Sequence, residues 1–239
     1  MDDNDFRAPT STRRRRTHTL GALVGAAALL SVGAPFAGAT AATLPSARLA
    51  VSSAPSLLDA HAGMTAAASS RAVPAGAKHL SAGGDFKAAV GALRPGDTLV
   101  VAGGTYHGFT GLSAHGTADH RITVMAAPGS RPVVEGLFWA TLDYVTLDGI
   151  NVTWKSGTSS SSHMMKMKGG TGWRLTNGEV WGAHSYAALL ISGTPSQYQV
   201  DHMYFHDTYK SNDTNQDHLI YVNGGMGGGL ITRNLFAHS

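Results

Sequence analysis

Two short sequence patterns recur at a regular spacing through the second half of the chain. The first alternates apolar side chains and ends on glycine, in Met164–Gly170, Ala188–Gly193 and Asp217–Gly225. The second has four copies that begin 28, 25 and 31 residues apart: Leu147–Val152, Leu175–Val180, Val200–Phe205 and Ile231–Phe236. Period-two strands broken by glycine or asparagine at this spacing predict a solenoid of stacked strands.

The composition agrees with a glycine-punctuated all-β domain. The 239 residues include 30 glycines, and only 14% of them are charged. The chain has no cysteine, so a disulfide framework is excluded and the stacked core has to supply the stability.

Residues 1–41 read as a secretory signal peptide. Arg13–Arg16 form a basic block, Leu20–Leu30 is apolar, and small residues at Ala37–Ala41 suit cleavage. A membrane anchor is the alternative, although the apolar run falls short of the roughly 20 residues that a span needs. The arginine block loosely resembles a twin-arginine signal, so both export routes stay open. We expect a secreted, extracellular protein without membrane association after signal removal.

The basic charge belongs mainly to that segment. Without its five arginines and three aspartates, the 18 Lys and Arg and 15 Asp and Glu become 13 and 12, a net charge of +1. No basic stripe remains, so we expect no nucleic-acid partner. Residues 42–78 are rich in Ala, Ser and Pro and read as a linker, which leaves 79–239 for the folded domain.

The folded domain is expected to open with a short amphipathic helix. Phe86, Ala89, Val90 and Leu93 fall on one face of a helix over residues 85–93, and such a helix could cap the open end of the stack. Strands of four or five residues are expected next, at Thr98–Val101, Gly103–Tyr106, Arg121–Met125 and Pro132–Glu135.

Two segments of this opening carry a family resemblance. FKAAVGALRPGDTLVVAGGTY and GTADHRITVMAAPGSRPVVEG resemble the first coil of right-handed parallel β-helix proteins of the pectin-lyase-like superfamily. Within it they are most similar to the secreted polysaccharide lyases of the alginate lyase and chondroitinase B type. The resemblance implies an all-β, right-handed parallel β-helix with three strands per coil and a short N-terminal capping helix.

Each copy of the first pattern is then the first strand of a coil, and the second pattern supplies the other two. The second pattern is expected to bend at Asp148-Gly149, Asn177-Gly178, His202 and Arg233-Asn234, because Gly and Asn tolerate the left-handed conformation of a tight corner. With the alternate apolar residues inward, the outward first-strand positions are Lys166, Lys168, Leu190, Ser192, Tyr221 and Asn223. The resemblance implies that this face, with the loops 155–162, 181–187 and 207–217, forms a substrate groove.

The groove would carry residue types suited to an acidic polysaccharide. Cations bind the uronate carboxylates, and β-elimination needs a base and an acid, which Lys, His and Tyr can supply if their surroundings shift their pKa values. The catalytic candidates are Lys166, Lys210, Tyr221 and His206, and the substrate-binding candidates are Lys168, Asn223, His184, Tyr186 and His218. An ordinary solvated face and a noncatalytic glycan-binding or cell-surface module remain the alternatives.

No cofactor is required by this hypothesis, but one loop could bind a cation. Asp207, Asp213 and Asp217 lie in eleven residues and offer the oxygen ligands that Ca²⁺ prefers. His202 and His206 have a zinc-like spacing, yet on a strand they stand roughly 13 Å apart. The sequence outside the signal has no adjacent aspartate pair, nucleophile elbow, phosphate loop or dinucleotide fingerprint, which disfavours common hydrolase and nucleotide-binding classes.

The sequence stops at Ser239, directly after a core strand. We expect a partial gene product, because the last coil has no visible cap. A monomer is expected unless that coil self-associates.

Overall fold

The computed structural model describes residues 72–209, 217–224 and 227–239. The expected signal peptide, most of the expected linker, Lys210 and Asp213 lie outside these residues. The first described strand, β1 (Lys78–Leu80), begins at the predicted end of the linker.

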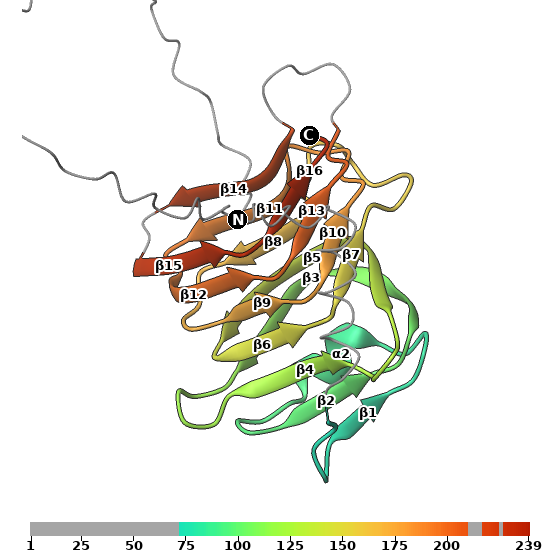
Figure 1. The fold of residues 1–239 in the computed structure, drawn as a ribbon, viewed down its shortest axis with the longest axis vertical. Helices are drawn as coiled ribbons and strands as arrows, with labels where there is room; N and C mark the ends of the chain where they lie inside the picture. Colours follow the sequence, from blue (N-terminus) through green and yellow to red (C-terminus); the bar gives the residue numbers. More distant parts are fainter. Residues whose placement is uncertain (1–71, 210–216, 225–226) are drawn as a thin grey trace, which may run out of the picture. The chain divides into compact units, whose positions relative to one another are not determined.

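The described chain is an all-β parallel solenoid, a β-helix (Figure 1). One sheet has the order β1-β2-β4-β6-β9-β12-β15, where β2 is Thr98–Val101, β4 Ile122–Ala126, β6 Val145–Asp148, β9 Arg174–Thr176, β12 Ser196–Asp201 and β15 Gly227–Thr232. We call it the second-strand face. Its neighbouring strands pair in parallel throughout, as stacked coils require.

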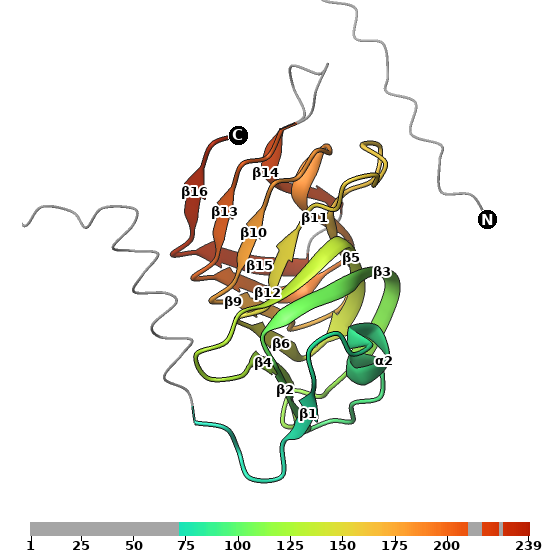
Figure 2. The same cartoon turned by 90° about the vertical axis from the view of Figure 1, so that its right-hand side faces the viewer.

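The other sheet contains two faces of the solenoid (Figure 2). The first-strand face consists of β8 (Met165–Lys168), β11 (Ala187–Gly193), β14 (His218–Gly224) and the C-terminal halves of β3 (Gly104–His115) and β5 (Pro132–Asp143). The third-strand face consists of β7 (Asn151–Thr153), β10 (Glu179–Trp181), β13 (Tyr204–His206), β16 (Leu235–Ala237) and the N-terminal halves of β3 and β5.

Rows of inward side chains build the core. On the second-strand face the row is Val124, Leu147, Leu175, Val200 and Ile231. On the third-strand face it is Tyr106, Val134, Val152, Val180, Phe205 and Phe236. Each row belongs to a single aligned position of the repeat, so apolar side chains stack on one another through the solenoid.

The predicted corners between the second and third strands are confirmed. Gly149, Asn177, His202 and Arg233 have φ values of 72°, 54°, 52° and 53°. Asn151 and Asn234 reinforce the corners by accepting hydrogen bonds from the backbone N–H groups of Glu179 and Met203, at 2.9 Å each.

The prediction of only short strands is wrong for β3 and β5, which have twelve residues each. Burial alternates along all of β5, so its apolar side chains keep facing the core while the strand passes from the third-strand to the first-strand face. The turn between the faces occurs at Gly136, with φ 113°, and needs no loop. The solenoid therefore has first-strand segments before β8 that the repeat did not indicate.

The predicted helix is present as α2 (Phe86–Gly91). The Asp85 side chain caps it by accepting a hydrogen bond from the Ala88 N–H, at 2.9 Å. Phe86 is buried, and its ring lies 5.9 Å from Tyr106 and 6.1 Å from Phe138. The helix thus packs onto the core, while its role as a cap stays a prediction. No helix in the described ranges is long and apolar enough to cross a membrane.

Candidate functional site

The first-strand face carries two outward rows of side chains. One row is Trp139, Lys166, Leu190 and Tyr221, on β5, β8, β11 and β14; the other contains Lys168, Ser192 and Asn223. The predicted outward positions therefore align across the coils. Neighbouring strands lie about 4.8 Å apart, so Lys166 and Tyr221, two strands apart, have backbones about 10 Å from each other.

Lys166 lies over an aromatic ring that the sequence analysis missed. Its Nζ atom is 5.1 Å from the centre of the Trp139 indole, within range of a cation–π interaction. The Trp139 Nε1–H donates a hydrogen bond of 2.7 Å to the His163 carbonyl, which fixes the ring at the foot of the loop before β8. The alternation in Leu137–Asp143 was the signal that could have identified this residue.

Between the polar groups of this row lies an apolar position. Leu190 is an outward position of the row, yet it is only 4% exposed. Tyr221 is 40% exposed and stacks on His218, with ring centres 5.0 Å apart and planes at 21°. Along this row the lysine, the leucine and the tyrosine follow one another from strand to strand. Lys168 and Asn223 are exposed in the neighbouring row.

The loops that lead into the first-strand face carry three rings from successive coils. The His184 ring stacks with Trp154, with ring centres 6.0 Å apart and planes at 25°, and it forms a T-shaped pair with Tyr209, at 5.6 Å and 87°. We call Trp154, His184 and Tyr209 the aromatic column. Tyr186 lies nearer β11, with its ring 5.8 Å from His163, and its carbonyl accepts a hydrogen bond from the His218 N–H at 3.3 Å.

The structure places His206 on the third-strand face, in a chain of ionic contacts. Its Nε2 lies 2.8 Å from Oε1 of Glu179 and its Nδ1 lies 2.7 Å from Oδ2 of Asp207. Both ring nitrogens of His206 therefore have carboxylate partners, and its role as a base stays a prediction.

The chain of contacts extends in both directions. Arg131 pairs with Glu179 and its guanidinium lies 4.6 Å from the centre of the Trp181 ring, while Nδ1 of His238 lies 3.2 Å from Oδ1 of Asp207. The hydrogen bond from His206 holds the pKa of Asp207 below its ordinary value, with a smaller contribution from His238. This network ties β10, β13 and the segment after β16 together.

The calcium hypothesis gains no support from the described residues. Asp207 is paired with histidines, Asp213 lies outside the described ranges, and no group of three or more His, Asp or Glu side chains there could hold a metal ion. His202 and His206 are directed to different partners, Asp201 and Glu179. Calcium binding stays a prediction that depends on residues 210–216.

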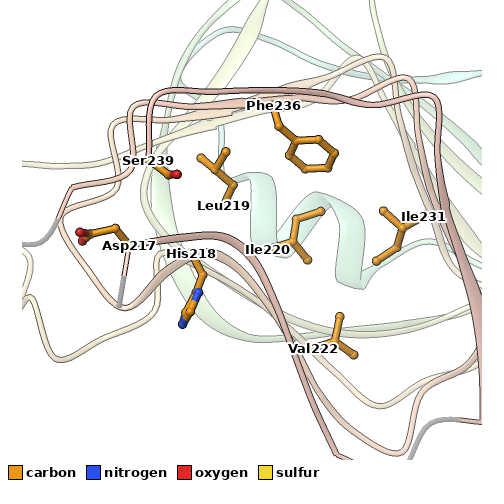
Figure 3. A pocket seen from close by; sticks show the side chains of 8 residues that line it. All are labelled: Asp217, His218, Leu219, Ile220, Val222, Ile231, Phe236 and Ser239. Atoms are coloured by element: carbon orange, nitrogen blue, oxygen red, sulfur yellow. The ribbon is translucent and has the colours of Figure 1, made fainter. Parts of the chain in front are cut away.

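A concavity with a volume of about 440 Å³ lies at the C-terminal end of the stack (Figure 3). Ile220, Val222, Ile231 and Phe236 point into it from the last coil, with Asp217, His218, Leu219 and Ser239 around them. These apolar residues continue the inward rows, so the concavity is the exposed end of the core.

Comparison with known proteins does not identify the chain. No protein-family model matches its sequence, and no curated protein matches it.

Proposed function

We propose that this protein is a secreted carbohydrate-active β-helix protein of the pectin-lyase-like type. Its ligand is an acidic, uronate-containing polysaccharide that lies along the first-strand face. The observation that carries the proposal is the pair Lys166 and Lys168, which project from one strand, with Lys166 over the Trp139 ring.

This arrangement suits the two chemical properties of a uronate polymer. The lysine ammonium groups can pair with its carboxylates, and the Trp139 ring holds one of these groups, that of Lys166, on the face where the polymer would lie. The net charge of residues 42–239 is only +1, so attraction to a polyanion has to come from such local groups rather than from the whole surface.

The reaction that these groups could support is β-elimination. A lysine would neutralise the carboxylate, a base would take the proton α to it, and the C–O bond to the next sugar would break as the C=C bond forms. The departing oxygen takes up a proton from an acid. Tyr221, with its exposed phenol beside His218, is our candidate for the proton transfer, and Lys166 for carboxylate binding.

A noncatalytic glycan-binding module is the second candidate. It is favoured by the position of Leu190, which lies between Lys166 and Tyr221 in the row and separates their backbones by about 10 Å. A sugar bridging the two groups would have to span this buried position.

The decisive experiment measures lyase activity and binding on the same protein. The secreted protein is incubated with alginate, pectate and chondroitin, with and without Ca²⁺, while the absorbance of unsaturated uronate is followed. Release that is abolished in Tyr221→Phe would support the lyase. Binding without release would favour the noncatalytic module, and neither binding nor release would refute the proposal for these polymers.

A further inference from the structure

The aromatic column is more exposed than the stacked pair Trp173 and Tyr198 in the core. Trp173 and Tyr198 stack at 4.9 Å and 18°, but they are buried, with 0% and 6% of their surfaces exposed. In the aromatic column, Tyr209 is 57% exposed and His184 is exposed as well. A stack that served only the core would bury these rings, because burial of apolar surface is what stabilises such a contact.

The backbone holds the column in place. The Tyr209 N–H donates a hydrogen bond of 2.7 Å to the Ala183 carbonyl, which joins two successive loops next to His184. Trp154 packs partly against the core and fixes the other end. The exposed rings are therefore presented on an ordered support, which reduces the entropy lost when a ligand stacks on them.

The loops that carry the column lead into the first-strand row, one loop for each coil. Trp154 lies in the loop that leads to the strand of Lys166, His184 in the loop that leads to Leu190, and Tyr209 in the loop that leads to Tyr221. Because β8, β11 and β14 are neighbours in the sheet (Figure 1), both rows extend along the axis of the stack. One extended chain could contact rings on one side and lysines on the other.

We propose that the aromatic column is a stacking surface for the sugar rings of the acidic polysaccharide, with Tyr209 and His184 as its contact residues. This inference rests on the proposed function and adds a ligand requirement to it. The face of an aromatic ring carries partial negative charge. It therefore attracts the C–H groups of a sugar, which carry partial positive charge because oxygens are bonded to the same carbons. The column therefore favours uronates whose rings present a face of C–H groups without an axial hydroxyl, in chains long enough to cross more than one coil.

The test uses titration calorimetry with uronate oligosaccharides of increasing length. Tyr209→Ala should weaken tetrasaccharide binding about ten-fold, as loss of one stacked ring does for other ring ligands, and should leave disaccharide binding much less affected. Tyr209→Phe should retain the affinity, because the ring is kept. The loss should persist at high salt, unlike the loss in Lys168→Ala, since stacking is not screened.

Tyr204→Ala is the matched control, because Tyr204 lies on the third-strand face, where it stacks on His206 at 4.1 Å. This variant should bind like the parent protein. Unchanged tetrasaccharide affinity in Tyr209→Ala, together with weaker binding in Lys168→Ala, would overturn the stacking surface and leave the proposed function intact. If the parent protein binds no acidic oligosaccharide, the proposed function itself is refuted.

Discussion

The Lys166 ammonium group lies over the Trp139 indole, with Nζ 5.1 Å from the ring centre. The interaction joins β5 to β8 across the first-strand face. It also restricts a long, flexible side chain to the surface where we place the ligand.

Replacing the ring should therefore weaken ligand binding. Trp139→Leu removes a cation–π interaction of about 0.5–1 kcal/mol and frees the lysine, so we expect acidic oligosaccharides to bind about three- to five-fold more weakly. Calorimetry on the folded variant measures this, with Trp181→Leu on the third-strand face as the control. Equal affinities in the parent and Trp139→Leu would show that Trp139 does not support the site.

The ion pair between Arg174 and Asp201 should contribute to stability. Arg174 donates two hydrogen bonds of 2.7 Å to the carboxylate, which is only 3% exposed. Arg174→Ala leaves a buried charge with weaker partners, so we expect the free energy of unfolding to fall by about 2–3 kcal/mol. Arg233→Ala is the control, because its guanidinium is 3.6 Å away and 63% exposed; it should cost less than about 1 kcal/mol. Similar losses of unfolding free energy in both variants would contradict the larger contribution that we assign to Arg174.

The Asp201 carboxylate should make the free energy of unfolding depend on pH in the acidic range. Burial alone would raise the pKa of Asp201, but the hydrogen bonds from Arg174 and His202 outweigh it and hold the pKa below 3.8. A lowered folded-state pKa means that the stabilisation is present above the unfolded pKa and is lost as the pH falls through the folded one. Urea unfolding measured at decreasing pH, from pH 6 to below the unfolded-state pKa of about 3.9, should show a smaller decline of the unfolding free energy in Asp201→Asn than in the parent protein. An identical decline of the unfolding free energy in both proteins would show that Asp201 does not cause this pH dependence.

Close stacking of coils makes some glycines irreplaceable. A Cβ at Gly178 would lie 2.4 Å from the Ile150 carbonyl oxygen, a backbone atom that cannot move without shifting a neighbouring coil. Gly178→Ala should therefore destabilise the fold by about 1–3 kcal/mol. Gly91→Ala is the contrast, because the nearest atom is at 3.8 Å and alanine favours the helix by about 0.5–1 kcal/mol. Thermal unfolding should therefore show a lower Tm for Gly178→Ala and a Tm no lower than that of the parent protein for Gly91→Ala. A similar change of Tm in both variants would contradict the role of close packing at Gly178.

A substitution of His206 can distinguish a structural role of this residue from a catalytic one. Because both of its nitrogens contact carboxylates, His206→Gln should lower the unfolding free energy by about 1–3 kcal/mol while the folded variant keeps its ligand affinity and any lyase rate. A loss of turnover of more than about a hundred-fold in a folded variant would instead place His206 among the general acid–base groups.

The repeat in the sequence was sufficient to predict the main features of the fold. Period-two alternation ending on glycine located β8, β11 and β14, and it assigned Lys166, Leu190 and Tyr221 to one outward row. The corner positions followed from the backbone preferences of Gly and Asn, and they extended to His202 and Arg233 because a repeat requires the same turn in every coil.

Contacts between residues far apart in the sequence could not be predicted in the same way. The length of β5, and hence the place of Trp139, depends on a strand turning at Gly136 without a loop. The contact of His206 with Glu179 depends on the register of β10 against β13, which alternation alone does not determine. Both features arise from the pairing of coils rather than from local sequence.

The most direct test of acidic-polysaccharide binding compares Lys166→Ala and Lys168→Ala with the parent protein over a range of salt concentrations. Exposed ion pairs contribute about 0.2–1 kcal/mol each and are screened beyond roughly 8–10 Å at physiological ionic strength. We predict that each variant binds a uronate oligosaccharide about two- to five-fold more weakly at low salt and that its affinity depends less on salt. Unchanged affinity and salt dependence in both variants would show that the first-strand face does not bind the polymer.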